Sequence, residues 1–261
     1  RLSHRGAAGA DPETGDGAGI IMQIPHEFFV SEFAKIDIVL PDAGDYGVGM
    51  VFLPLDPNTR YYCEGLFEKI LKEENQKLIG WRTVPVNDKA CGKSARSTMP
   101  IVKQVFVDRN GLDKDAFRRK LYIIRKRVER EIFESKKAYT ESFYICSMSA
   151  DTIVYKGQFL ARQLGDFYLD LQNKKVKSAI AVVHQRYSTN TFPSWQLAHP
   201  YRFIAHNGEI NTIRGNVNLQ DSRLEYSSDN INADITQGNH VQLYENGIFL
   251  ENDTSTNHLP R

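Results

Sequence analysis

The sequence of 261 residues predicts a mixed fold of helices and strands, arranged as one large domain or two small ones. Segments with strand-type and helix-type hydrophobic spacing alternate along the chain, and no internal repeat or low-complexity stretch interrupts them. Hydrophobic residues make up 41% of the chain and charged residues 25%, which is ordinary for a folded globular protein.

The strands are predicted from short apolar runs that end near Pro, Gly, Asp or Asn. In chain order they cover 20–24, 46–53, 79–84, 101–107, 143–148, 152–156 and 179–183. The fifth and sixth are expected to form a hairpin. The last is a β-branched run, AIAVV, and is expected to be a buried strand with residues 184–186 emerging at its end.

The helices are predicted from apolar residues three and four positions apart, over 28–34, 61–76, 112–137 and 161–171. Asp56 precedes the second helix in a turn or cap, and Leu66, Ile70 and Leu71 are expected to face inward. The third carries two basic runs, at 118–120 and 125–127, which indicate a solvated helix face rather than an RNA contact.

Charge and cysteine content narrow the functional class. A formal net charge of +1 predicts neither a nucleic-acid nor a membrane partner, and no apolar stretch is long enough to span a bilayer. Cys63, Cys91 and Cys146 are odd in number, far apart and without metal-ligand spacing. They argue against a disulfide scaffold or a zinc site and favour a reducing compartment. The chain begins with Arg rather than Met, so we expect its natural start to lie upstream.

The most informative stretch is HNGEI at 206–210. Asn-Gly suits a tight turn in which both residues reach a positive φ. Such a turn exposes the Gly208 N–H and aims the Asn207 carboxamide in nearly the same direction, and two such donors can hold an oxyanion. Upstream, the guanidinium of Arg186 can fork onto a carboxylate. Alone, however, Asn-Gly is usually a hairpin turn and an Arg after a strand is usually a solvated end.

Several motifs in a fixed order decide between these readings. They are HRGA at 4–7, TGDGAGI at 14–20, GWRTVP at 80–85, FYICS at 143–147, TIVYKG at 152–157, QRYSTNTFPSW at 185–195 and HNGEI at 206–210, followed by IRGNVN at 213–218. Together they resemble the amidotransferase domain of glutamate synthase large chains, a class II, N-terminal nucleophile glutamine amidotransferase. The RYST and HNGEI elements are shared across the class, whereas STNTFPSW and the early glycine-rich block are specific to glutamate synthases.

The resemblance implies an α+β fold, the four-layer α-β-β-α sandwich of N-terminal nucleophile hydrolases, incomplete in this chain. It also implies that glutamine is hydrolysed to glutamate and ammonia by an N-terminal cysteine thiolate, whose own α-amino group is the base. In the family the ammonia passes through a tunnel to a synthase domain of the same chain, where it is transferred to 2-oxoglutarate. That domain carries FMN and an iron-sulfur cluster, so no cofactor is expected in this segment.

Roles carry over position by position. Arg186 is expected to grip the substrate α-carboxylate, and Thr189 to add polar contacts. Asn207 and Gly208 are expected to form the oxyanion hole. Two further residues belong to the same region, His199 as a support of the pocket and Arg5 near the nucleophile. The resemblance also implies that the glycine-rich segment 15–19 lies near the glutamine site. A nucleotide-binding loop is disfavoured there, because the glycine spacing matches neither a dinucleotide nor a P-loop fingerprint.

Two departures from the family pattern accompany these expectations. The nucleophilic cysteine is expected a few tens of residues before His4, and none of the three cysteines present matches its motif. The amidotransferase domain is expected over 1–218, followed by a divergent polar tail over 219–261 that is either disordered or the product of an altered reading of the gene. Asp229 in that tail comes too early to replace the family's aspartate that binds the substrate α-amino group.

Two alternatives remain open. The chain is either an active amidotransferase part or a non-catalytic glutamine-binding remnant without its nucleophile. An amidotransferase serving another synthase, such as one that forms phosphoribosylamine or glucosamine phosphate, is disfavoured by the string at 189–195. The compartment is expected to be reducing, cytoplasm or plastid, and the electron donor of the whole enzyme, ferredoxin or a nicotinamide nucleotide, is not indicated.

Overall fold

The computed structural model describes residues 11–135, 142–187 and 192–202, together with two short strands at 241–243 and 249–251. The chain divides into two compact units, Arg1–Ala205 and His206–Arg261, and each is described by itself. In the second unit, β8 (Val241–Leu243) pairs antiparallel with β9 (Phe249–Glu251). The predicted boundary at 218 and the predicted disorder of the tail stay predictions.

The first unit contains a four-stranded antiparallel sheet with the order β3-β4-β2-β5. Its strands are β2 (Tyr46–Leu53), β3 (Lys77–Thr83), β4 (Ile101–Asp108) and β5 (Tyr144–Ser149). All eight residues of β2 are buried, as a central strand covered on both faces requires. All four strands were predicted within a few residues of their observed bounds.

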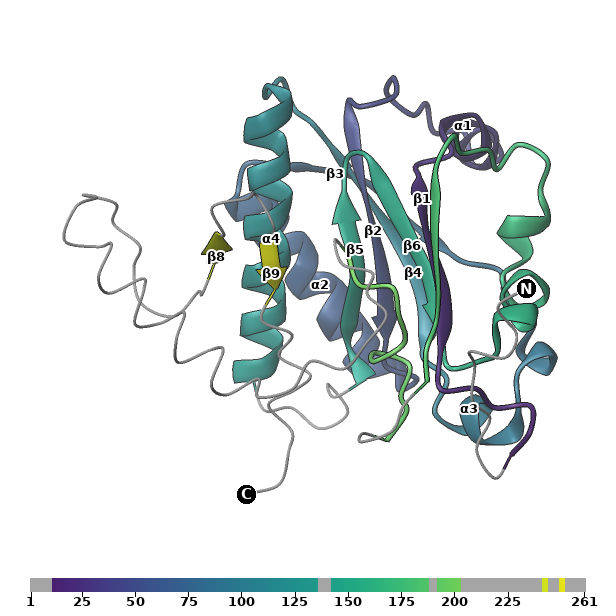
Figure 1. Cartoon of the computed structure of the whole chain (residues 1–261). Helices are drawn as coiled ribbons and strands as arrows, with labels where there is room; N and C mark the ends of the chain where they lie inside the picture. Colours follow the sequence, from purple (N-terminus) through teal and green to yellow (C-terminus); the bar gives the residue numbers. More distant parts are fainter. Residues whose placement is uncertain (1–10, 136–141, 188–191, 203–240, 244–248, 252–261) are drawn as a thin grey trace. The chain divides into compact units, whose positions relative to one another are not determined.

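A second, three-stranded antiparallel sheet has the order β6-β1-β7. Its strands are β1 (Ala18–Gln23), β6 (Thr152–Gly157) and β7 (Ala181–Gln185). In Figure 1 this sheet lies beside the four-stranded one, on the side away from α2 and α4. Among the described strands, β7 lies at the edge of this sheet, and Val182 and Val183 are exposed. The prediction that 179–183 is a buried strand is therefore wrong, because its side chains are left uncovered, unlike those of the opposite edge strand β6.

Two long helices cover the outer face of the four-stranded sheet (Figure 1). Helix α2 (Pro57–Glu73) begins at Asp56, whose carboxylate accepts the Thr59 N–H at 2.7 Å. Helix α4 (Lys114–Glu134) begins at Asp113, which caps the Ala116 N–H in the same way. The inward-facing residues predicted for the first of these helices are buried.

The predicted solvated face of α4 is only partly right. Arg125 is buried, and its guanidinium donates to the Glu129 carboxylate at 3.1 and 3.2 Å. A buried arginine needs such a partner, because an isolated charge in a low-dielectric interior is costly. Arg125 of the basic run therefore lies in the interior and is paired, rather than on the solvated face of the helix.

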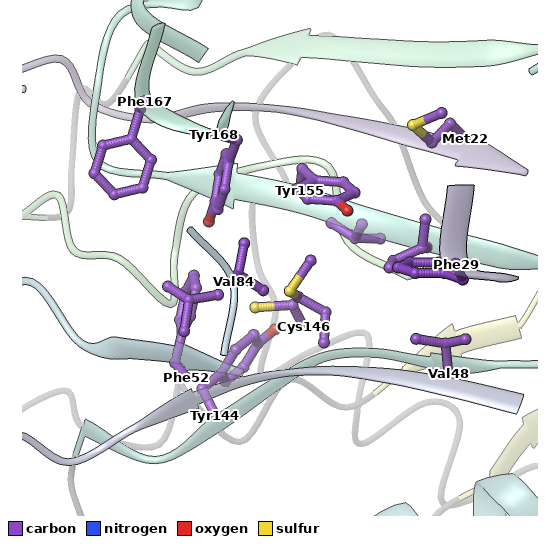
Figure 2. Close-up of a cluster of buried hydrophobic side chains, with 14 of the residues drawn as sticks. Met22, Phe29, Val48, Phe52, Val84, Tyr144, Cys146, Tyr155, Phe167 and Tyr168 are labelled. Carbon is purple, nitrogen blue, oxygen red and sulfur yellow. The ribbon is translucent and has the colours of Figure 1, made fainter. Parts of the chain in front are cut away.

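The space between the two sheets is filled by an aromatic-rich core. Figure 2 shows side chains from both sheets meeting there, among them Met22 of β1, Phe52 of β2 and Tyr155 of β6. Helix α1 (His26–Ala34) closes one end through Phe29 and Phe33, whose rings lie 5.0 and 4.4 Å from that of Phe106. Edge-to-face aromatic pairs of this kind add to the burial free energy of the rings.

The predicted hairpin over 143–156 is wrong. Strand β5 pairs with β2, and β6 pairs with β1, so the short connection carries the chain from one sheet to the other. The two strands remain in contact at this corner, where the Val154 N–H donates to the Ser147 hydroxyl at 3.1 Å. Both strands are buried, and each finds a better backbone partner in its own sheet than in the other.

The predicted helix over 161–171 is broken into three short pieces, η4 (Ala161–Gln163), α5 (Leu164–Phe167) and η5 (Leu169–Gln172). Hydrogen bonds to distant residues fix the chain where the helix is interrupted. Tyr168 donates its hydroxyl to the Lys156 carbonyl at 2.7 Å, and Asp170 accepts both terminal nitrogens of Arg82 at 2.7 Å. The remaining short helices are η2 (Asp88–Ala90) and α3 (Lys93–Ser97).

Candidate functional site

The candidate site lies at the end of the three-stranded sheet where the glycine-rich segment enters β1. Gly17 has a φ of 135°, a conformation that favours glycine, and a Cβ there would lie 2.8 Å from the Cα and Cβ of Ala198. A Cβ at Gly19 would lie 2.7 Å from the His199 carbonyl oxygen. The glycines therefore let the segment 198–199 approach the backbone of β1.

The start of the glycine-rich segment is fixed by a polar turn. The Asp11 carboxylate accepts the Thr14 hydroxyl at 2.8 Å and the Ser94 N–H at 3.1 Å. These hydrogen bonds, the one from the Ser94 backbone above all, hold the pKa of Asp11 below its usual range. Gly92 also donates its N–H to the Glu13 carbonyl at 2.9 Å, so residues 11–14 are tied to α3.

Arg186 follows directly after β7 and lies against the glycine-rich segment. Its backbone N–H donates to the Gly17 carbonyl at 2.7 Å, and its Nη1 lies 3.5 Å from the Asp16 carbonyl oxygen. The side chain is partly exposed. The backbone of Arg186 is therefore held in register with β1, and its guanidinium lies against the glycine-rich segment.

His199 is buried, and its backbone lies against Gly19 of the glycine-rich segment. Its ring centroid lies 4.7 Å from that of His184 and 4.2 Å from that of Tyr201, and the His199–Pro200 peptide bond is cis. His184 is the cross-strand partner of Gly19, whose missing Cβ makes room for the His199 carbonyl. The structure thus brings Arg186 and His199 to the same glycine-rich segment.

The three cysteines are all buried. Burial raises the pKa of the Cys146 thiol to about 12 and also raises that of Cys91. Cys146 lies in the core between the sheets (Figure 2). A thiol that is buried and protonated at neutral pH is a poor nucleophile. That none of the three cysteines is catalytic stays a prediction.

The remaining predicted site residues, Arg5, Thr189, Asn207 and Gly208, lie outside the described residues. In the described part of the chain, no group of three or more His, Cys, Asp and Glu side chains could hold a metal ion. Nor does any helix described here have the length and apolar character needed to cross a membrane.

Sequence reasoning missed Lys156 as a residue of this region. Its side chain is fully buried, and its Nζ donates to the Gln196 carbonyl at 2.8 Å, three residues before His199. A lysine inside an otherwise buried strand pattern was the available signal, because lysine is almost never fully buried unless it is paired.

Comparison with known proteins identifies the family. The sequence model of the family "Glutamine amidotransferases class-II" matches residues 1–243. The chain belongs to the class II glutamine amidotransferases. The described part of its first unit accordingly has the α+β sandwich of N-terminal nucleophile hydrolases, with two antiparallel sheets and flanking helices.

The relatives of this amidotransferase domain are glutamate synthases. It is 45% identical over 242 residues to the glutamate synthase [NADPH] large chain of Bacillus subtilis, covering 91% of this chain and 15% of that protein. It is 47% identical over 224 residues to the ferredoxin-dependent glutamate synthase 1, chloroplastic/mitochondrial, of Arabidopsis thaliana, covering 85% of this chain and 14% of the relative. The chain therefore spans about 15% of the length of the relatives it matches.

Proposed function

We propose that this domain binds L-glutamine and, as part of a longer glutamate synthase, hydrolyses it to L-glutamate and ammonia. The observation that carries the proposal is the placement of Arg186, which is partly exposed and whose backbone N–H donates to the Gly17 carbonyl at 2.7 Å beside the glycine-rich segment. A guanidinium held in this way suits the bidentate binding of an α-carboxylate.

The roles of the other site residues are part of the proposal. Thr189 adds polar contacts to the glutamine, Arg5 lies near the nucleophile, and His199 supports the pocket wall. Asn207 and Gly208 donate to the oxyanion that forms when a thiolate attacks the γ-amide. The attacking thiolate belongs to an N-terminal cysteine of the mature protein, since the three cysteines of this chain are buried.

The fate of the ammonia is also proposed from the relatives. Their names describe glutamate synthases that depend on NADPH or on ferredoxin. We infer that the ammonia is transferred to 2-oxoglutarate in a synthase domain of the same chain, which carries FMN and an iron-sulfur cluster. A reducing compartment, the cytoplasm or a plastid, fits three cysteines that form no disulfide in the structure.

The test uses the full-length protein and measures ammonia release from glutamine. Removing an oxyanion donor in Asn207→Ala should lower kcat by about a hundredfold or more. Arg186→Met should raise the KM for glutamine by about thirtyfold, which corresponds to about 2 kcal/mol for a lost charge-assisted contact. Arg130→Met is the matched control, because Arg130 pairs with Glu134 on the surface of α4. Unchanged kinetics in both site variants would overturn the assignment.

The second candidate is a glutamine-binding module without hydrolysis. The burial of all three thiols favours it if the mature protein carries no N-terminal cysteine. Calorimetry on the native protein separates the two candidates. Glutamine binding together with ammonia release supports the enzyme, whereas binding without ammonia release supports the module.

A further inference from the structure

The side chain of Lys156 is fully buried in β6, between the core residue Tyr155 and Gly157. Burial of an ammonium group is costly unless hydrogen bonds and aromatic faces replace the water it loses. Its Nζ donates to the Gln196 carbonyl at 2.8 Å and lies 3.4 Å from the Tyr144 hydroxyl. The same atom lies 4.5 Å from the ring centroid of Tyr144 and 4.7 Å from that of Tyr201.

The main chain around Lys156 is fixed independently of its ammonium. Its carbonyl accepts the Tyr168 hydroxyl at 2.7 Å, and its backbone is paired with β1 opposite Gly19. On the other side of β1, Gly19 is paired with His184. Cross-strand partners share one face of a sheet, so Lys156, Gly19 and His184 form a row across the three strands.

The segment 193–201 lies along the end of β6 and makes repeated contacts with it. A Cβ at Gly157 would lie 2.5 Å from the ring of Trp195, and Gln158 donates to the Pro193 carbonyl at 3.3 Å. Lys156 adds the third contact, to the Gln196 carbonyl. Of these contacts, the one from Lys156 is nearest in sequence to His199 and is the only one that involves a charge.

We propose that Lys156 is a positioning residue of the glutamine pocket. Its ammonium holds the Gln196 carbonyl and the ring of Tyr201, and these two contacts flank His199 on both sides along the chain. His199 is thereby kept against Gly19 and His184, beside the segment that holds Arg186. This role rests on the proposed glutamine site, and no substrate contact is assigned to Lys156 itself.

The proposal requires that Lys156 act on the pocket beyond its contribution to the core. Lys156→Met keeps the length and the apolar stem but removes the charge and the donors. Lys103→Met is the matched control. Lys103 lies on β4 of the other sheet, where its Nζ pairs with Glu64 at 2.8 Å, so its loss costs stability without touching the segment 193–201.

The experiment measures glutamine kinetics and amide hydrogen exchange in the full-length protein. In Lys156→Met, the KM for glutamine should rise about tenfold and kcat should change less than about threefold. Exchange of the amides in 192–202 should accelerate about tenfold, while α2 and α4 keep their protection. Lys103→Met should change neither the KM nor the exchange of 192–202.

A double variant tests whether Lys156 acts through His199. The KM effects of Lys156→Met and His199→Ala should be non-additive, with the double variant within about twofold of the worse single one. Multiplicative effects, or a Lys156→Met enzyme with a normal KM and normal exchange, would overturn the proposal.

Two further outcomes are covered by the design: a Lys156→Met protein that does not fold, and a wild-type protein without glutamine activity. If Lys156→Met does not fold, Tyr201→Leu removes one ring beside the ammonium and should raise the KM and the exchange of 192–202 in the same direction. A normal KM in that variant counts against the proposal. If the wild-type protein neither binds nor hydrolyses glutamine, the proposed function fails, and the exchange measurement alone decides whether Lys156 anchors the segment.

Discussion

Gly19→Ala should be one of the most destabilising single-methyl additions in this domain. The added Cβ would lie 2.6 Å from the Lys156 Cβ and 2.7 Å from the carbonyl oxygens of Tyr155 and His199. Comfortable contacts of such atoms are about 3.5 Å or more. None of the three atoms is the end of a flexible side chain, so the backbone of β6 or of the segment 198–199 has to move.

The expected cost follows from these contacts. Overpacking costs about 1–3 kcal/mol, and three simultaneous contacts with backbone atoms or a Cβ place this site at the upper end, about 3 kcal/mol. In a domain of this size each kcal/mol lowers the Tm by about 2–4 °C, so the expected drop is about 6–12 °C. The KM for glutamine should rise as well, because His199 is displaced.

Gly65→Ala is the matched control for the same chemical change. Gly65 lies inside α2, and a Cβ there would meet nothing within 4 Å. Alanine is a better helix former than glycine by about 1 kcal/mol, so the Tm should rise by about 2–4 °C. Thermal unfolding followed by tryptophan fluorescence measures both, since Trp195 is buried. A Gly19→Ala protein as stable as the wild type would refute the close approach.

Three further predictions follow from buried or capping groups. Arg82→Met should cost about 3–5 kcal/mol in urea unfolding because it leaves Asp170 buried without its bidentate partner, and Asp170→Asn should cost less. The thiol of Cys146 should resist alkylation until the protein unfolds. Folding raises the pKa of this thiol from 9.0 to about 12, so between these values the unfolded protein loses the proton first and the free energy of unfolding falls as the pH rises. In Cys146→Ala this decrease at alkaline pH should be shallower. Asp56→Ala should cost about 1 kcal/mol by uncapping Thr59 at the start of α2, and a wild-type denaturation midpoint would contradict it.

Local patterns predicted the elements better than their partners. The strand over 46–53 and the helix over 28–34 were predicted because apolar spacing follows from the period of each structure. The placement of β5 and β6 in different sheets was not predictable in this way. A short connection between two strands usually makes a hairpin, and only the burial of both strands against separate partners separates them here.

The broken helix shows a second limit of pattern reasoning. Apolar spacing over 161–171 favours a helix. The side chains of Tyr168 and Asp170, however, form hydrogen bonds with Lys156 and Arg82, which are distant in sequence. Tertiary hydrogen bonds of buried groups outweigh local propensities of a few tenths of a kcal/mol per residue. The same holds for Lys156, whose role depends on the Gln196 carbonyl, forty positions later in the chain.

The glycine-rich block illustrates how spacing separates two uses of glycine. Gly15, Gly17 and Gly19 occupy every second position, so they face one side of an extended segment. Added Cβ atoms would meet Phe159 at Gly15, Ala198 at Gly17, and Lys156 with His199 at Gly19. These contacts come from two protein segments that lie along the glycines. A phosphate loop instead curls its N–H groups around a ligand at the start of a helix and requires a different spacing. The period of two therefore indicates a surface on which other segments of the same chain pack closely. This packing brings the segment that contains His199 to the end of β7, where Arg186 lies.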